Sequence, residues 1–189
     1  MRLTYPQDAI VVVAGLPGAG KSTLIRRAGA GSGAVVVDTD DQRRERGRAS
    51  YVRHYGRILA AVCGRRPVVI HSRGTRRALR RAIVLAASPR GRPAHLILLD
   101  APRAEAEAGQ RRRGRTLPLR AMERAAARWE RLRRRGVRGE GWRSVVVLDR
   151  ADAARVEALQ WGVHKSPGTT GFDAVGSWGW LRVEVPEAS

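Results

Sequence analysis

Residues 15–23 read GLPGAGKST, and they lie between an apolar run, AIVVVA at 9–14, and a segment at 21–29 with helical periodicity. The run before the glycines is rich in β-branched residues, which predicts a buried strand. A strand, a glycine-rich turn and a helix in this order favour phosphate binding, because backbone N–H groups and the positive end of the helix converge on the turn.

The spacing of the turn, Gly15, four residues, Gly20, Lys21 and Ser22, is the P-loop (Walker A) pattern. The glycines let the backbone wrap phosphate oxygens, the compact ammonium group of Lys21 reaches the β- and γ-phosphates, and the Ser22 hydroxyl coordinates Mg²⁺. The sequence contains no guanine-specificity segment of the NKxD type, which favours ATP over GTP. We therefore predict that ATP and Mg²⁺ are bound, with contacts from Gly15, Pro17, Gly18, Ala19, Gly20, Lys21, Ser22 and Thr23.

Four further apolar runs predict strands, at 34–38, 67–72, 94–100 and 144–149. Amphipathic segments between and after them predict helices at 50–64, 75–87, 119–135 and 151–161. Buried strands that alternate with helices indicate an α/β P-loop domain, a three-layer αβα sandwich around a mostly parallel five-stranded sheet. We expect this domain to span residues 1–162 and a Gly-, Ser- and Pro-rich tail to span 163–189.

The spacing of apolar residues also predicts the face that each helix turns toward the sheet. In the segment at 50–64 this face carries Val52, Tyr55, Leu59 and Val62. In the segment at 75–87 it carries Leu79, Ile83 and Ala86, and the residues expected to point outward are Arg76, Arg77, Arg80 and Arg81. In the segment at 119–135 it carries Leu119, Met122, Ala126 and Trp129.

Carboxylates follow the second predicted strand, in VDTDDQR at 37–43. Asp38, Asp40 and Asp41 are expected at the carboxyl end of that strand, the edge at which open parallel sheets bind ligands. A carboxylate there either accepts a proton from an attacking hydroxyl or holds Mg²⁺ through water. Arg43 could clamp a phosphate of the acceptor. Capping of the next helix by Asp40 is the structural alternative, and it is compatible with catalysis.

An arginine-rich segment, residues 101–118, follows the fourth predicted strand and is interpreted as a lid over the triphosphate. Its cluster around Gly114 consists of Arg111, Arg112, Arg113 and Arg115. Arginines in such a position neutralise the charge that spreads over a transferring phosphoryl group. A solvated basic face and a groove for a nucleic-acid backbone are the two other interpretations of the cluster.

Together these segments resemble the AAA-type P-loop kinase group that contains phage polynucleotide 5′-kinase, zeta toxins and chloramphenicol phosphotransferase. The polynucleotide kinase pattern reads GxPGxGKST, DDxR and an arginine-containing lid, and this chain has GLPGAGKST at 15–23, DDQR at 40–43 and RRRGRTLP at 111–118. The resemblance covers roughly residues 9–135. It implies that Asp40 is the general base and Arg43 binds the acceptor phosphate. It also implies that Arg113 contacts the transferring phosphate, with Arg112 and Arg115 as competitors.

The chain departs from this group at the end of the third predicted strand, IHSRGT at 70–75. Such kinases often carry an acidic residue there, and here Arg73 takes its place. The carboxylate that orients Mg²⁺ must then be Asp38 or Asp40, or else Ser22 and water hold the metal. His71, at a buried strand end, is interpreted as structural rather than as a substrate contact.

Composition limits the class of protein less sharply. The net charge is +20, and only two of the basic residues are lysines, Lys21 and Lys165. This bias fits a nucleic-acid partner and coding from a GC-rich genome equally well. The one cysteine, Cys63, excludes an intramolecular disulfide and is expected to be a buried, inert thiol. No apolar run approaches the ~20 residues of a membrane span and no signal peptide is recognised, so we expect a cytoplasmic protein.

The predicted function is transfer of the ATP γ-phosphate to a hydroxyl acceptor, either a polynucleotide 5′-hydroxyl or a small molecule. The alternative is an ATP-binding or ATP-hydrolysing regulator with a protein or nucleic-acid partner, for which the third predicted strand offers no water-positioning residue. A nucleic-acid-binding protein with a vestigial nucleotide site is a third hypothesis, and the intact Lys21 and Ser22 argue against it.

Overall fold

A computed structural model describes residues 1–38, 48–114 and 116–162. Its centre is a five-stranded sheet in which all neighbouring strands are parallel. Listed across the sheet, the strands are β3 (Val35–Asp38), β4 (Val68–His71), β2 (Ile10–Gly15), β5 (Ala94–Leu99) and β6 (Ser144–Leu148). The predicted α/β fold class with a five-stranded parallel sheet is therefore confirmed.

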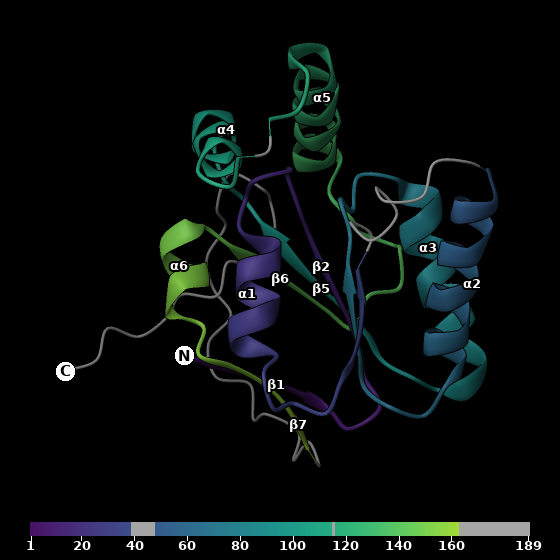
Figure 1. Cartoon of the computed structure of the whole chain (residues 1–189). Helices are drawn as coiled ribbons and strands as arrows, with labels where there is room; N and C mark the ends of the chain where they lie inside the picture. The colour runs from purple at the N-terminus through teal and green to yellow at the C-terminus, as the bar shows by residue number, and fades with distance from the viewer. Residues whose placement is uncertain (39–47, 115, 163–189) are drawn as a thin grey trace.

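Helices cover both faces of the sheet (Figure 1). α2 (Arg48–Cys63) and α3 (Arg77–Ala87) lie together on one side, and α3 continues into a short 3₁₀ turn, η2 (Ser88–Arg90). α1 (Lys21–Ala28) and α6 (Arg150–Arg155) lie on the other side, while α4 (Arg103–Arg111) and α5 (Leu119–Arg135) lie beyond the carboxyl ends of the strands. Among the helices that the structure describes, none combines the length and apolar character that crossing a bilayer requires.

The core explains why the strands read as continuous apolar runs. Every residue of β2, β4 and β5 is buried, because each of these strands has a neighbour on both sides and helices on both faces. β2 lies between β4 and β5, so the loop that follows it emerges from the middle of the sheet.

The predicted helix at 151–161 is wrong over its second half. α6 ends at Arg155, and Ala158–Gly162 form a strand, β7, that pairs in parallel with β1 (Arg2–Pro6). The two strands make a second sheet, in which Tyr5 lies beside Trp161. Neither strand could be identified alone, since each is ordered by a partner at the opposite end of residues 1–162.

Several predicted helix faces also need correction. In α2 the buried residues include Ile58 and Val62, whereas Tyr55 and Leu59 are 38% and 53% exposed. Leu119, the first residue of α5, is 65% exposed because the helix begins beyond the sheet. Cys63 is half-buried at the end of α2 rather than buried. Arg80, expected to point outward, is only 3% exposed.

Candidate active site

The phosphate loop begins where β2 ends, at Gly15. A Cβ atom at this residue would lie 2.8 Å from the carbonyl oxygen of Leu99 on the adjacent strand β5, so the first glycine of the motif is needed for close strand packing. The loop then turns through two glycines with left-handed backbone angles, Gly18 at φ 91° and Gly20 at φ 103°. Only glycine adopts such angles without strain, and they turn the chain from the strand into α1.

Helix α4 packs directly on this loop. A Cβ atom at Gly18 would lie 2.0 Å from the carbonyl oxygen of Ala106, and one at Gly109 would lie 2.3 Å from the carbonyl oxygen of Gly18. The backbones of the loop and the helix therefore touch, so the base of the predicted lid packs directly on the P-loop. The sequence motif identified Gly18 but contained no signal for its partner Gly109.

Lys21 is the first residue of α1 and is 6% exposed. Its Nζ atom donates to the carbonyl oxygens of Gly15 and Leu16, at 3.0 and 2.9 Å. The ammonium group is therefore held over the loop. No described side chain caps the N-terminus of α1, and its first turn contains no acidic residue. The positive end of the helix dipole is thus directed at the loop, which suits an anion.

The lid reaches this loop through Arg113. Its Nη2 atom donates to Thr23 Oγ1 at 2.8 Å, although the two residues are 90 positions apart. Arg113 is exposed, as are the other described lid arginines, Arg111 and Arg112, and Arg115 lies outside the described residues. The hydrogen bond to the P-loop helix thus comes from Arg113, and Arg112 lines the cavity beside the same helix.

Gln110 connects the lid to the loop, and sequence reasoning missed it. Its amide nitrogen donates to the Pro17 carbonyl oxygen at 3.2 Å, and its amide oxygen accepts from the N–H of Leu117 at 3.0 Å. Gln110 is buried, and both bonds are partly shielded from water. One side chain therefore couples the phosphate loop to both ends of the arginine cluster.

A cavity of about 240 Å³ opens beside the loop, between α1, the end of α4 and α6. Its lining includes Gly20, Thr23, Arg112, Arg113 and Arg150. Arg27 also lines it, and donates to the carbonyl oxygen of Val156 at 3.0 Å, which fixes the end of α6 against α1. The cavity is continuous with the phosphate loop and carries positive charge on its lid side.

The predicted carboxylates are only partly described. Asp38 ends β3 and lies opposite His71 in the register of β3 and β4, and its Oδ1 contacts the Nδ1 atom of His71. His71 is 3% exposed, so this histidine is buried against one of the two carboxylates that the sequence offers for orienting the metal. Asp40, Asp41 and Arg43 lie in residues 39–47, outside the described residues.

Asp100, at the end of β5, was not singled out from the sequence. Its Oδ1 accepts from Trp129 Nε1 at 3.1 Å, and its Oδ2 lies 3.4 Å from Arg133. Both partners belong to α5. Asp100 thus fastens the C-terminal half of α5 to the sheet.

The donors present fit Mg²⁺ bound together with a nucleotide. Among the described residues no group of three or more His, Cys, Asp or Glu side chains could hold a metal on its own. Mg²⁺ characteristically takes one or two protein oxygens and completes its shell with phosphates and water. Ser22, in the first turn of α1, and Asp38, at the end of β3, are oxygen donors of the kind this requires.

Comparison with known proteins identifies the family. A family model described as AAA domain matches residues 10–135, about two thirds of the chain. The chain belongs to the AAA domain family. With its P-loop between a parallel sheet and α1, it is a P-loop kinase-like NTPase, as the resemblance implied. No curated protein matches it by sequence.

Three solved structures share its fold. A gluconokinase from Sinorhizobium meliloti 1021 has a TM-score of 0.58 at 19% identity over 80% of this chain and 89% of its own. A structure from the PezAT toxin-antitoxin system of Streptococcus pneumoniae has a TM-score of 0.55 at 14% identity, and the match covers 80% of this chain and 71% of its own. A putative kinase from Chloroflexus aurantiacus j-10-fl has a TM-score of 0.54 at 14% identity, and the match covers 79% of this chain and 90% of its own. At such identities the likeness is one of fold.

Proposed function

We propose that this NTPase transfers the γ-phosphate of ATP to a hydroxyl group of an acceptor. The contact that carries the proposal is the hydrogen bond from Arg113 to Thr23, because it brings a cation of the lid to the loop that would hold the triphosphate. A guanidinium at that position suits the charge that spreads over a phosphoryl group in flight. The family match supports the nucleotide as a ligand.

In this proposal the loop from Gly15 to Thr23 binds the phosphates through its N–H groups and the N-terminus of α1. Lys21 exchanges its two carbonyl acceptors for β- and γ-phosphate oxygens, which is a short movement for a side chain that already lies over the loop. The cavity beside the loop receives the rest of the nucleotide.

Mg²⁺, when bound, neutralises charge on the β- and γ-phosphates. Ser22 would hold it through its hydroxyl, and Asp38 through water. His71 would orient the Asp38 carboxylate by the contact between Nδ1 and Oδ1.

The transfer step assigns a role to Asp40 and Arg43. Asp40 accepts the proton of the acceptor hydroxyl as its oxygen attacks the γ-phosphorus, and the bond to the bridging oxygen breaks to release ADP. Arg43 binds a phosphate of the acceptor, and Arg113 neutralises the transferring group. These assignments come from the motif DDQR and from the lid, and residues 39–47 are outside the described structure.

The test is phosphoryl transfer from γ-labelled ATP with Mg²⁺. The acceptors are a 5′-hydroxyl oligonucleotide and a pooled set of small hydroxy compounds, and Lys21→Ala serves as the blank. Asp40→Asn should retain ATP affinity and lower the transfer rate by about 10²–10⁴. The oligonucleotide tests whether nucleic acid is the partner.

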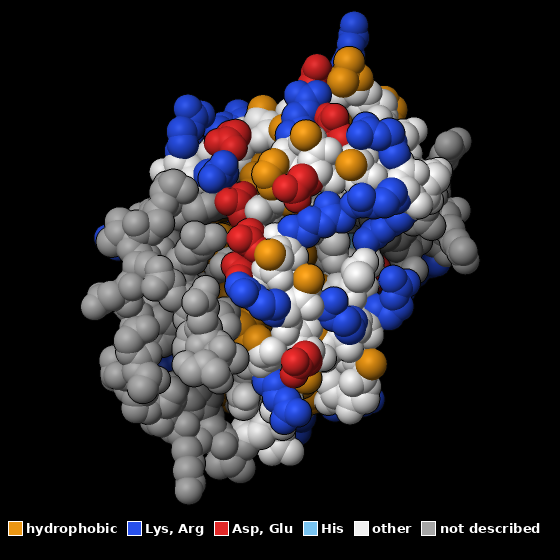
Figure 2. All heavy atoms as spheres, turned by 90° about the vertical axis from the view of Figure 1, so that its left-hand side faces the viewer, with side chains coloured by type: hydrophobic (Ala, Val, Ile, Leu, Met, Phe, Trp, Pro, Cys, Tyr) orange, Lys and Arg blue, Asp and Glu red, His pale blue; other side chains and the backbone are white. Residues whose placement is uncertain are grey.

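The surface charge bears on that question. On the face shown in Figure 2 the Lys and Arg side chains are interspersed with acidic ones.

Label on any acceptor that depends on Lys21 supports the proposal. Lys21-dependent phosphate release with no labelled acceptor contradicts it and favours an ATP-hydrolysing regulator. Loss of nucleotide binding in Asp40→Asn would contradict the role of Asp40 as a base.

A further inference from the structure

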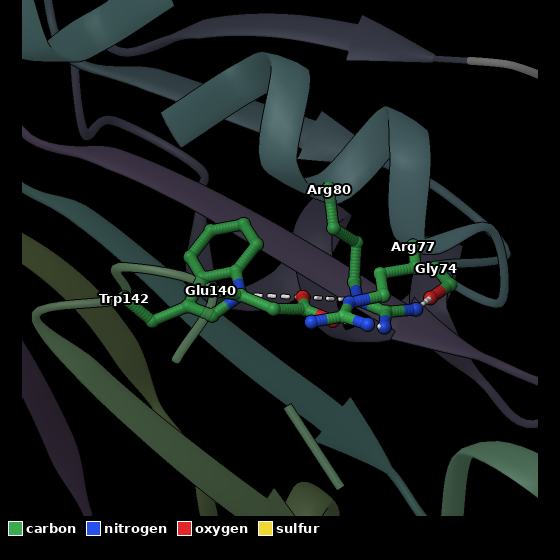
Figure 3. A network of polar contacts seen from close by, with 5 residues as sticks. All are labelled: Gly74, Arg77, Arg80, Glu140 and Trp142. Carbon is green, nitrogen blue, oxygen red and sulfur yellow. Dashed lines mark hydrogen bonds and ion pairs between the residues drawn. The ribbon is translucent and has the colours of Figure 1, made fainter. Parts of the chain in front are cut away.

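Two of the described arginines are buried, Arg80 on α3 and Arg92 just before β5, and they are 3% and 5% exposed. Arg80 has a buried carboxylate as its partner (Figure 3). Its Nε donates to Oε2 of Glu140 at 2.7 Å and its Nη2 to Oε1 at 2.6 Å, and Trp142 Nε1 also donates to Oε2, at 3.2 Å. The charge of Arg80 is therefore compensated inside the protein, as a buried charge requires.

Arg92 is held differently, because within the described residues it forms no ion pair with a carboxylate. Its guanidinium donates at 2.6–3.0 Å to five backbone carbonyl oxygens, those of Asp8, Ala61, Val62, Gly64 and Arg66. These bonds satisfy its N–H groups, and the C-terminal end of the α2 dipole supplies about half a negative charge. Burial lowers the pKa of Arg92, while the charge of Asp8 raises it and that of Arg90 lowers it again. The positive charge of Arg92 is thus only partly compensated.

A cavity of about 760 Å³ lies next to Arg92. Its walls are the turn at 7–8, the segment at 63–67 between α2 and β4, and the segment at 90–92 before β5. These segments lie at the amino ends of the strands, whereas the P-loop follows the carboxyl end of β2. The six residues of β2, at ~3.3 Å each, separate the two edges by about 20 Å. The cavity is therefore distinct from the nucleotide site, and its size suits a small ligand.

The charge around this cavity is strongly positive. Among the described residues its lining contains one carboxylate, that of Asp8, and four arginines, Arg65, Arg66, Arg90 and Arg92. Arg65 and Arg90 are exposed, and neither forms a hydrogen bond or an ion pair in the part of the chain that the structure describes. Like charges gathered around one cavity repel each other, and an anion that enters the cavity relieves this repulsion.

We propose that the cavity is a second ligand site, which binds a small polyanion through Arg65 and Arg90. Each guanidinium offers paired N–H donors that match a phosphate or a carboxylate. The two arginines come from different segments, and the arginines around the cavity outnumber its carboxylate, so the ligand should carry at least two such groups. The site does not depend on the proposed function, because the P-loop lies at the opposite edge of the sheet.

The test follows occupancy of the cavity at two places. The backbone amide signals of Gly64 and Gly91, which adjoin the two arginines in the chain, are followed by NMR. The chain's one cysteine, Cys63, lines the cavity, so the rate of its alkylation by N-ethylmaleimide gives a second measure. The probes are inorganic diphosphate and citrate, and sodium chloride at the same ionic strength is the comparison.

We expect at least one of the two polyanions to give saturable shifts of both signals and to slow the alkylation, while sodium chloride does neither. Arg65→Gln and Arg90→Gln should each weaken that binding about tenfold. Arg131→Gln is the matched control, since it removes an exposed arginine from α5, beyond the carboxyl ends of the strands, and it should weaken binding less than about twofold.

Tighter binding of diphosphate indicates a phosphorylated ligand, and tighter binding of citrate indicates a polycarboxylate. The inference is overturned if neither polyanion gives saturable shifts, if sodium chloride reproduces the effects, or if Arg131→Gln weakens binding as much as the other two variants.

Discussion

Removal of the Glu140 carboxylate tests how much the buried ion pair contributes. Glu140→Ala leaves Arg80, 3% exposed, with a buried charge, and also removes an acceptor from Trp142. Losing one partner of a buried pair lowers the free energy of unfolding by about 3–5 kcal/mol. That is a large share of the ~5–15 kcal/mol typical of a domain. For a protein of this size each kcal/mol lowers the melting temperature by about 2–4 °C.

Urea unfolding followed by circular dichroism measures the change. Glu130→Ala is the matched control, since its carboxylate is 57% exposed and pairs with Arg133 at 3.2 Å on the surface of α5, where a loss below about 1 kcal/mol is expected. The double variant Arg80→Ala with Glu140→Ala should be destabilised by less than the sum of the single variants, because it leaves no uncompensated charge. A loss in Glu140→Ala no larger than in Glu130→Ala would refute the argument.

Three further predictions concern the second sheet, the P-loop and the lid. Tyr5→Phe should raise the free energy of unfolding by about 1 kcal/mol, because the buried hydroxyl has no hydrogen-bond partner among the described residues. Burial also raises the pKa of Tyr5, so above about pH 10 the tyrosine ionises in the unfolded state before it does in the folded state. The free energy of unfolding should therefore fall more steeply with rising pH in the wild type than in Tyr5→Phe. Thermal unfolding of both proteins from about pH 8 to 11 measures this difference. Gly18→Ala should weaken binding of a non-hydrolysable ATP analogue, measured by calorimetry, because the added Cβ would meet Ala106. Gly31→Ala is the control, since Gly31 also has a positive φ but lies in open space, and this variant should bind the analogue as the wild type does. Gln110→Leu should speed hydrogen exchange of the peptide that contains Leu117, and unchanged exchange would contradict the coupling of lid and loop.

The parallel sheet could be predicted because its signal is local. Each strand is buried on both faces, so it appears as a short apolar run that can be recognised without knowing its partners. The strands β1 and β7 carry no such run. Each has exposed residues, and their pairing joins Arg2 to Ala158, so neither segment has a local signal strong enough to identify it.

The residues at the P-loop likewise include some that the sequence could predict and others that it could not. Gly15 to Thr23 could be predicted as a phosphate-binding loop because a P-loop holds phosphate mainly through consecutive backbone groups, so the motif contains its own geometry. Gln110, Gly109 and Asp100 could not, because their roles depend on which loop or helix packs against them. The assignments of Asp40 and Arg43 stay predictions.

By itself, the sequence determined the fold class, the position of the phosphate loop and the arginine cluster that follows the fourth of its apolar runs, since each depends on residues that are close together in the chain. Only the tertiary structure decided that Arg113 contacts Thr23 and that Arg80 is buried rather than solvated. Arg80 lies on a helix surface where helical periodicity predicts solvent, and the carboxylate that draws it inward is 60 residues away. Local periodicity reports the average environment of a helix face, whereas a buried charge is stable only where a distant partner compensates it.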